Sequence, residues 1–440
     1  MSENLKINAD GVKDLLKTAK DGSPYPTIDN AVIVFRNDPF FKGNIKLNLF
    51  RDRIEFTGEV PWKRTGIDIS ELDDVQIRYY TETIYRMTNA KKIREGMQII
   101  AAENGYHPVR DYLNSLSWDG TERIGHVLHH FLGVEESDFS NEFMKLFLLG
   151  AIERVFHPGC KFDYMLCLVG GQGVGKSSFI RMLACFDSWF CDDIKRLDDE
   201  KIYEHLAGHW ILEIAEMLAL NNAKCNEATK AFMTRQCDNY RLPYGIRAED
   251  RPRQCVFAGT SNIVHFLPND RSGNRRFLPV LCDASKADIH ILEDETGSRK
   301  YIEQLWAEAM VIFRSGKYQL KLPRNIEKDL ASYQEPFMQE DTWADMIKSF
   351  LEDFTGNIVC TRMLYREALE MYGMPNKIET AQIMEIMSHI PGWIRFNNPR
   401  HFQNYKRQKG WERVTTSPAT KASTPDFKNA DTWENPFETQ

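Results

Sequence analysis

The sequence predicts an α/β fold whose centre is a parallel sheet with crossover helices. From Asp163 onward, short apolar runs alternate with helical patterns, which is typical of parallel strands joined by helices. The first apolar run, Met165–Val169, leads directly into a glycine-rich segment. The pattern differs on either side of this centre: a mixed α+β N-terminal domain precedes it, and a helical, winged-helix-like C-terminal domain follows it.

Composition agrees with several domains. The chain has 440 residues, 42% of them hydrophobic, and at roughly 150 residues per domain it predicts about three folded units. Beyond residue 413 the sequence lacks apolar periodicity and is rich in Thr, Ser, Pro and Asn, which predicts a disordered tail. The expected ranges are the mixed α+β domain at 1–120, a helical connector at 121–160, the central domain at 161–322, the helical winged-helix-like domain at 323–413 and the tail at 414–440.

Charge and cysteine content exclude several classes of protein. The net charge of -7, from 56 basic and 63 acidic side chains, does not suit a chain that coats nucleic acid through net charge, so DNA contacts must come from local patches. No apolar run could span a bilayer and the N-terminus has no signal core, so we expect a soluble, cytoplasmic protein without a membrane partner. The nine cysteines contain no CxxC pair and are expected to be reduced, mostly buried thiols. A zinc site from distant ligands, including some of the 11 histidines, stays open.

The N-terminal domain and connector show local patterns without catalytic character. Residues 44–56 alternate apolar and polar around Arg51-Asp52, which predicts a hairpin, and 70–86 and 90–104 are predicted helices. The adjacent pair Asp73-Asp74 would diverge by about 100° on a helix, so it indicates a solvated face and not a polymerase metal site. A tight turn at Trp118-Asp119-Gly120 is expected before helices that run to about residue 157 and pack beneath the central domain.

The strongest motif is GGQGVGKS, which lies between the Met165–Val169 strand and a helix predicted over Ser178–Ala184. Strand, glycine-rich loop and helix follow in the order of a P-loop. The glycines let backbone N–H groups surround a phosphate, and the helix N-terminus adds its positive dipole end. Lys176 would balance phosphate charge, and Ser177 would give its hydroxyl to magnesium. The motif predicts a P-loop NTPase core that binds ATP and Mg²⁺ through Gly170, Gly171, Gln172, Gly173, Val174, Gly175, Lys176, Ser177 and Ser178.

A P-loop enzyme also needs an acidic residue at the end of a neighbouring strand. The run Trp210–Glu216 is apolar except for two carboxylates, Glu213 and Glu216. In a regular strand these would face opposite sides, so only one should point at the nucleotide. Glu216 is favoured as base or water-orienting group because it ends the run. Glu213 is the alternative, or a magnesium ligand through water, and both are candidate metal residues.

Further candidates follow the next strand. Cys255–Asn262 is an apolar run with a polar end, where Asn262 could bind the attacking water or the γ-phosphate. Arg271, Arg275 and Arg276 then surround a Gly-Asn turn. An arginine finger that meets transition-state charge is one interpretation. Ion pairing with Asp270 or Asp283 is the other.

A basic, aromatic segment separates the acidic strand from this one. Arg241 and Arg247 lie on either side of Pro243-Tyr244-Gly245. This pattern predicts a loop or hairpin tip suited to phosphate binding and base stacking. The alternative is that nearby carboxylates neutralise the arginines of this segment locally, namely Asp238, Glu249 and Asp250.

Together these segments resemble the virulence-associated protein E family, phage and pathogenicity-island ATPases similar to superfamily 3 helicases and to phage and poxvirus primase-helicases. The likeness covers most of the chain and rests on an ordered set of motifs: DYLNSLSWDGTERI, GGQGVGKS, WILEIAEM, YRLPYG, PRQCVFAGTSN and GNRRFLPV. The resemblance implies a ring-forming, DNA-stimulated ATPase. It implies Asn262 as sensor, Glu216 as catalytic carboxylate, Arg275 or Arg276 at a neighbouring subunit's ATP, and Lys230, Arg241 and Arg247, with Tyr244 at the tip between them, near DNA.

The functional hypothesis is an ATP-dependent DNA helicase or translocase that acts in replication of a phage or mobile element. Its expected partners are single-stranded or forked DNA and further copies of the chain, with a hexameric ring as one candidate assembly. The alternative is a DNA-binding replication initiator that uses ATP as an assembly switch. A small-molecule kinase is disfavoured, because it would need an acceptor pocket and lid. Larger relatives carry a primase or polymerase module upstream, but the N-terminal section shows no Asp-x-Asp and His constellation, so primer synthesis is not assigned.

Overall fold

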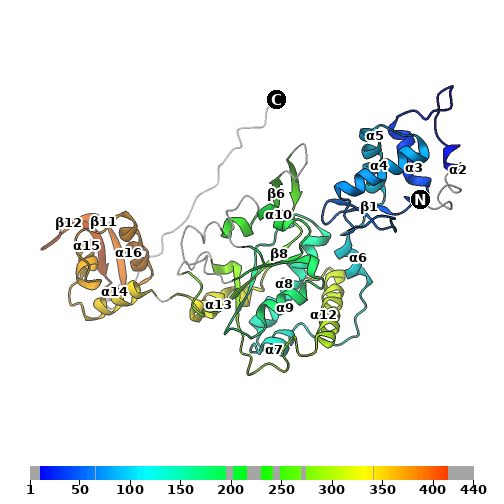
Figure 1. Ribbon diagram of the computed structural model, residues 1–440. Coiled ribbons are helices and arrows are strands. Elements are labelled where there is room, and N and C mark those ends of the chain that lie inside the picture. The colour runs from blue at the N-terminus through cyan, green and yellow to red at the C-terminus, as the bar shows by residue number, and fades with distance from the viewer. Residues whose placement is uncertain are drawn as a thin grey trace, which may run out of the picture. The chain divides into compact units, whose positions relative to one another are not determined.

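The computed structural model describes residues 10–64, 66–194, 202–215, 229–240, 248–268, 274–339 and 341–414. The chain forms two compact units, Met1–Gln339 and Glu340–Gln440. Each has its own hydrophobic cores, and the first contains the central parallel sheet (Figure 1).

A mixed α+β region begins the first unit. The predicted hairpin is confirmed, because β1 and β2 pair antiparallel around a turn in which Asp52 has a φ of 53°. The expected solvated face is wrong for the pair Asp73 and Asp74. Asp73 is 3% exposed, caps α4 and lies 3.0 Å from Arg64, and Asp74, whose side chain is 14% exposed, pairs with Arg94 at 2.6 Å. The elements are α2 (Asp10–Lys13), α3 (Ile28–Asn37), β1 (Ile45–Asn48), β2 (Arg53–Phe56), α4 (Glu71–Tyr85), α5 (Ala90–Glu103) and α6 (Pro108–Ser115).

The predicted turn and connector helices follow. The Trp118 indole N–H donates to the Thr121 carbonyl oxygen over 2.9 Å, and Gly120 takes a φ of 88° that favours glycine. Helices α7 (Val127–Leu132) and α8 (Asp138–Phe156) come next. Apolar side chains of α8 share one core with the central sheet, which confirms the predicted packing of this stretch; they include Phe143, Leu146, Leu148 and Ile152.

Five strands form the parallel sheet. Their spatial order is β4 (Phe190–Cys191), β5 (Ile211–Ile214), β8 (Val256–Ser261), β3 (Met165–Val169) and β9 (Phe277–Leu281). The expected parallel sheet is therefore present. One expectation is corrected: β8 lies between β3 and β5, so the acidic strand is not the neighbour of the strand that precedes the glycine-rich loop.

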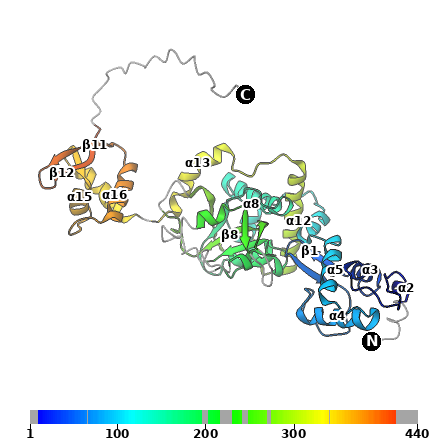
Figure 2. The same ribbon diagram turned by 90° about the horizontal axis from the view of Figure 1, so that it is seen from above.

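Both faces of the sheet are covered. All five residues of β3 are buried, as expected for a parallel strand between two layers. Leu166 and Leu168 pack in a core with α8, α9 (Lys176–Leu183) and α12 (Glu295–Ser315), whereas Met165, Cys167 and Val169 pack in a second core (Figure 1, Figure 2). The other elements around the sheet are η1 (Asp187–Trp189), α10 (Ile202–Leu206), η3 (Asn274–Arg276), α13 (Arg324–Gln334) and η4 (Glu335–Phe337).

A two-stranded hairpin, β6 (Cys237–Tyr240) and β7 (Glu249–Pro252), precedes β8. Its base is held by a buried ion pair, because the Arg253 guanidinium donates to both carboxylate oxygens of Asp238 at 2.8 and 2.7 Å. Both side chains are at most 3% exposed. Removal of one partner of such a pair costs about 3–5 kcal/mol of folding free energy. The sequence interpretation of a hairpin is supported by its stem, while its tip at 241–247 lies outside the described residues.

The second unit begins at Glu340 and not at the expected residue 323, because α13 buries Ile326 and Leu330 in the core of the first unit. Its three-stranded antiparallel sheet has the order β10-β12-β11. The expected helices are present, but the short strand β10 was missed. The elements are α14 (Thr342–Asp353), β10 (Ile358–Cys360), α15 (Thr361–Met363), the π-helix η5 (Leu364–Ala368), α16 (Lys377–His389), β11 (Trp393–Phe402) and β12 (Lys406–Arg413).

The expectations about cysteines and membrane-spanning helices can be compared with the described part of the chain. The eight cysteines described there are all free, and five of them are buried. None of the helices in these ranges is long and apolar enough to cross a bilayer. The expected tail lies outside the described residues, apart from Val414.

Candidate functional site

The glycine-rich loop connects β3 to α9 at the C-terminal edge of the sheet. Gly173 and Gly175 have φ values of 84° and 91°, which side-chain-bearing residues rarely adopt. Gly170 is required for space, because an added Cβ would lie 2.4 Å from the carbonyl oxygen of Cys282. The loop can therefore take this course only with glycine at these positions.

Lys176 lies at the centre of the loop. Its ammonium group donates to the carbonyl oxygens of Gly170 and Gly171 at 2.7 and 2.6 Å, and to Asn262 Oδ1 at 3.0 Å. The side chain is 7% exposed, and burial lowers the pKa of its ammonium group. Lys176 and Asn262, 86 residues apart in sequence, thus meet at one edge of the sheet, as the motif order predicts.

Ser177 and Glu213 also meet there. The Ser177 hydroxyl donates to Glu213 Oε1 over 2.6 Å, and the Thr260 hydroxyl donates to the same oxygen over 2.7 Å. Thr260 lies on β8, the strand between β3 and β5, which brings its hydroxyl beside Glu213 of β5. Thr260 is not among the residues that the sequence predicts, because a threonine inside a strand gives no functional signal.

Glu213 has a free oxygen in a buried place. Glu213 is only 1% exposed. Within the described ranges, its Oε2 atom has no hydrogen-bond partner. Such a buried, unsatisfied carboxylate oxygen is costly unless a cation or water binds it. Mg²⁺ prefers oxygen ligands, so the hydroxyl of Ser177 and the carboxylate of Glu213 fit a magnesium ion.

The second carboxylate cannot be placed. Glu216 lies outside the described residues, since β5 ends at Ile214 and the described chain stops at Ala215. Its role as base stays a prediction.

The two candidate finger arginines stand at the other edge of the sheet. Arg275 and Arg276 precede Phe277, which pairs with Met165 at the start of β3, whereas the loop follows the end of β3. At about 3.3 Å per residue, the strand separates the two edges by roughly 16 Å. Neither arginine is therefore placed to reach phosphates bound to the loop of its own chain.

The environments of these two arginines differ. Arg275 is exposed. Arg276 Nε lies 3.5 Å from Asp163 Oδ2, so Arg276 does form a local ion pair, but with a partner other than the expected Asp270 or Asp283. Asp270 lies outside the described residues, and Asp283 accepts a hydrogen bond from Ser285.

The expected DNA-contacting residues are only partly described. Arg241, Tyr244 and Arg247 lie outside the described residues. Lys230 is buried, with 5% of its surface exposed. Its contact with DNA stays a prediction. Local neutralisation holds for two further arginines of this segment: Arg253 pairs with Asp238, and Arg251 pairs with Asp52 and Glu249.

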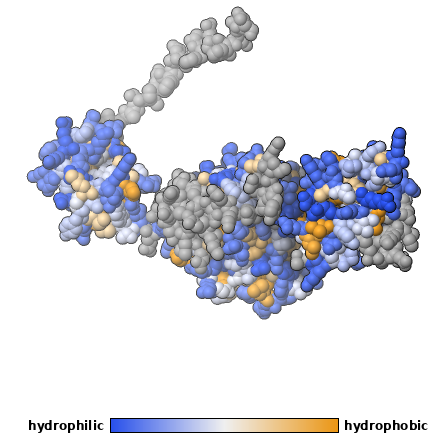
Figure 3. Space-filling model, turned by 45° about the horizontal axis from the view of Figure 1, so that its top comes forward, coloured by the Kyte–Doolittle hydropathy of each residue, from blue (hydrophilic) through white to orange (hydrophobic). Residues whose placement is uncertain are grey.

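A basic hairpin lies in the second unit. The β11–β12 hairpin carries six Lys or Arg residues and one Glu between 393 and 413. Within the described ranges, four exposed basic side chains have no carboxylate partner, namely Arg395, Lys406, Arg407 and Lys409. The face shown in Figure 3 is mostly hydrophilic in this unit.

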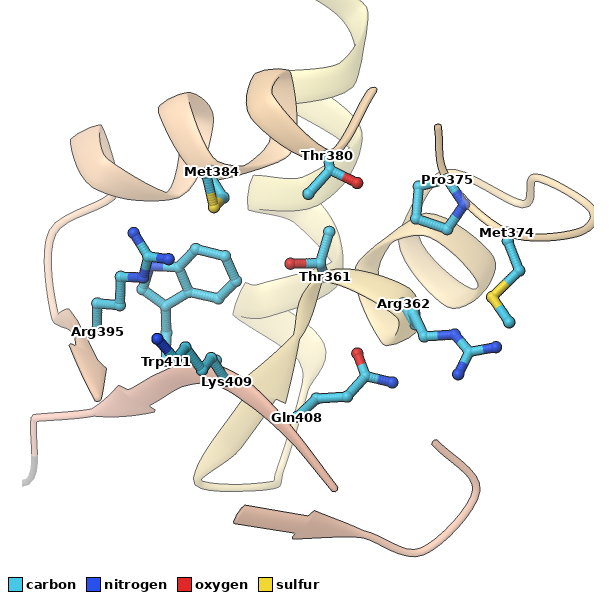
Figure 4. A pocket seen from close by; sticks show the side chains of 11 residues that line it. Thr361, Arg362, Met374, Pro375, Thr380, Met384, Arg395, Gln408, Lys409 and Trp411 are labelled. Atoms are coloured by element: carbon cyan, nitrogen blue, oxygen red, sulfur yellow. The ribbon is translucent and has the colours of Figure 1, made fainter. Parts of the chain in front are cut away.

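A cavity of about 380 Å³ adjoins this hairpin. Arg395 and Lys409 from the hairpin, with Arg362, give it basic groups, and Met384 of α16 lies opposite Trp411 (Figure 4). The lining of this cavity therefore combines basic side chains with apolar ones, which include Met374, Met384 and Trp411.

Residues 113–339, more than half of the chain, match the model of the virulence-associated protein E-like domain. The chain belongs to this family. The VapE-like domain thus contains all five strands of the central sheet, the glycine-rich loop and the residues that meet at its edge.

Solved structures give weaker likenesses to this VapE-like protein. One is titled "The apo structure of NrS-1 C terminal region (305-718)", with 13% identity over 84% of this chain and 96% of that chain, and a TM-score of 0.44. Another is titled "The A form apo structure of NrS-1 C terminal region-CTR", with 14% identity, the same coverage and a TM-score of 0.47. No curated protein matches the sequence.

Proposed function

We propose that this VapE-family protein is a P-loop ATPase that acts as a DNA helicase or translocase in replication of a phage or mobile genetic element. The observation that carries the proposal is the meeting of Lys176, Ser177, Glu213 and Asn262 at one edge of the parallel sheet. These groups supply the cation, metal ligands and polar sensor that phosphoryl transfer requires.

In this proposal each group has a separate task. Lys176 exchanges its bonds to the loop carbonyls for β/γ-phosphate oxygens. Ser177 and Glu213 hold Mg²⁺, which neutralises phosphate charge when bound. Asn262 orients the attacking water or the γ-phosphate, and Glu216 acts as base.

Isosteric variants distinguish the roles of the two carboxylates, Glu213 and Glu216. Glu213→Gln keeps an oxygen that can accept from Ser177 and Thr260 but removes the charge that faces Mg²⁺. We expect turnover about 10–100-fold lower, with a raised Mg²⁺ requirement. Glu216→Gln should bind MgATP normally and trap it without hydrolysis, a larger loss of turnover.

Mg²⁺ titrations of steady-state ATPase, together with nucleotide-retention measurements, test this assignment. Glu142→Gln, which alters a partly exposed side chain of α8, is the control and should match wild type. If Glu213→Gln had the larger loss and trapped nucleotide, the roles of the two carboxylates would be reversed.

We further infer that the second unit is a winged-helix module that contacts DNA through its β11–β12 hairpin. The order of helix, strand, helices and a terminal hairpin in one antiparallel sheet supports this inference, as do the unpaired basic side chains of the hairpin. Their charges can act on DNA although the whole chain is acidic, because phosphate contacts depend on local potential.

The double variant Lys406→Ala, Arg407→Ala tests the hairpin contact. If each residue binds one phosphate, the log–log salt slope of duplex binding falls by about 0.9 per residue. The matched control, Lys328→Ala with Lys348→Ala, removes two exposed charges from α13 and α14 and should leave the slope unchanged. An unchanged slope in the hairpin variant would place the DNA contact elsewhere, with the 241–247 tip as the next region to test.

The alternative function is a replication initiator that uses ATP only for assembly. ATPase rates with and without single-stranded DNA, followed by a fork-unwinding assay, distinguish the two. DNA-stimulated turnover with strand separation supports the helicase, whereas ATP-dependent assembly without unwinding supports the initiator.

A further inference from the structure

A histidine cluster lies on the first unit and shares no residue with the group that surrounds Lys176. His126, His130 and Asp288 bring one ligand atom each to within 4.8 Å of one another. His126 and His130 belong to the start and body of α7, whereas Asp288 lies in the segment after β9. Residues far apart in sequence are thus gathered around one point.

Asp288 is the centre of the cluster. Its Oδ2 lies 2.8 Å from His130 Nδ1 and 3.1 Å from His126 Nε2. A third ring, that of His129, places Nε2 3.8 Å from Asp288 Oδ1. Three imidazoles therefore face the two oxygens of one carboxylate.

The outer nitrogens of two rings are already engaged. His126 Nδ1 contacts the carboxylate of Glu136, and His129 Nδ1 lies 3.1 Å from the carbonyl oxygen of Val134. His130 is held by stacking on Tyr301, with ring centroids 4.7 Å apart. In metal sites, a hydrogen bond from the outer ring nitrogen to a carboxylate or carbonyl fixes the tautomer and leaves the inner nitrogen free to ligate.

We propose that His126, His130 and Asp288 form a binding site for a divalent transition-metal ion, with zinc as the best fit and His129 as fourth ligand. Imidazole nitrogens and a carboxylate are zinc ligands, and a tetrahedral ion with bonds of about 2.0–2.1 Å spaces its ligand atoms roughly 3.3 Å apart. The 2.8 and 3.1 Å separations from Asp288 Oδ2 would have to widen by a few tenths of an ångström. Ligand atoms that now spread over as much as 4.8 Å, and His129 Nε2 at 3.8 Å from Asp288 Oδ1, would have to move closer. Binding here does not depend on the ATPase proposal.

The metal would fasten the segment that supports the glycine-rich loop. Backbone hydrogen bonds already join this segment to α7, from Asp283 N–H to Leu132 and from Ile289 N–H to His130. At its two ends, Cys282 lies against Gly170, and His290 lies against Gly175. A metal ion at Asp288 would add a third connection between α7 and the segment that contacts the glycine-rich loop.

Metal binding by the full-length, chelator-treated protein tests the site, with Zn²⁺ in calorimetry and Co²⁺ as a visible-absorption probe. We expect one Zn²⁺ per chain and the strong d–d bands of tetrahedral Co²⁺. Asp288→Asn keeps the size of the side chain but loses its charge, and should weaken zinc binding at least 100-fold. Glu136→Gln, which alters only the partner of His126, should weaken it about 10–100-fold.

Two controls define the outcome. His157→Gln removes an exposed histidine that pairs only with Glu153 in the described structure, and should bind zinc like wild type. Lys176→Ala should also bind zinc normally, because the site is separate from the loop lysine. Because the Asp288 and Glu136 side chains are 44% and 52% exposed, Asp288→Asn and Glu136→Gln should fold with wild-type melting temperatures in chelator. Unchanged zinc affinity in Asp288→Asn, or less than one ion bound by wild type, would overturn the proposal.

Discussion

Lys176→Ala is expected to reduce ATP turnover by about 10³-fold, the upper end of the range for losing one preorganised electrostatic group at the reacting centre. Lys176 is the single cation among the four groups that meet at the sheet edge. Without it, water must balance the charge that develops on the γ-phosphate, and water cannot be preorganised in the same way. Steady-state phosphate release, with and without single-stranded DNA, measures the effect.

The variant should remain folded. Two of the three bonds of the Lys176 ammonium group end on carbonyl oxygens of the loop and the third on Asn262 Oδ1, so their loss affects the edge of the sheet and not its core. The loss is partly offset because the variant no longer buries a charge. Lys161→Ala is the matched control, because this exposed lysine lies just before β3. Near-wild-type turnover in a folded Lys176→Ala protein would contradict the P-loop proposal.

Loss of the finger arginine is expected to be as severe. Arg275→Ala should bind ATP normally but hydrolyse it about 10³–10⁵-fold more slowly, the range observed when arginine fingers are removed. Arg275 is the better candidate because it is exposed, whereas Arg276 is paired with Asp163. Its place at the edge opposite the loop requires that the finger act on the ATP of another copy of the chain.

A mixing experiment tests action between copies. Arg275→Ala retains an intact loop, and Lys176→Ala retains an intact arginine, so mixed assemblies contain some complete interfaces. We expect partial recovery of ATPase activity in the mixture and none when Arg275→Ala is mixed with itself. Arg324→Ala, which removes an exposed arginine from α13, should retain full activity. If verified mixed assemblies showed no recovery, a shared site would be excluded.

The sequence predicts the loop residues well because their chemistry is local. A strand, a glycine-rich turn and a helix are consecutive, so the positions of Lys176 and Ser177 follow from the chain itself. The meeting of Lys176 with Asn262 could also be anticipated, since the ends of parallel strands share an edge.

Other features depend on strand order, which periodicity does not reveal. The insertion of β8 between β3 and β5 makes Thr260 a partner of Glu213, and no local pattern marks that threonine. Likewise, the pairs Arg276 with Asp163 and Arg253 with Asp238 join residues whose proximity is created by the fold. The histidine cluster also depends on the fold, because Asp288 lies 158 residues from His130 in the sequence.

The buried ion pair at the base of the β6–β7 hairpin has a mechanical consequence. Only Arg253, Gln254 and Cys255 separate the end of β7 from the start of β8, and β8 ends next to Asn262. Arg253 is clamped by Asp238 on the other strand of the hairpin, so the stem cannot pivot freely about this junction. A load applied to the hairpin would therefore be carried as tension along one extended stretch of chain to the residue that contacts Lys176.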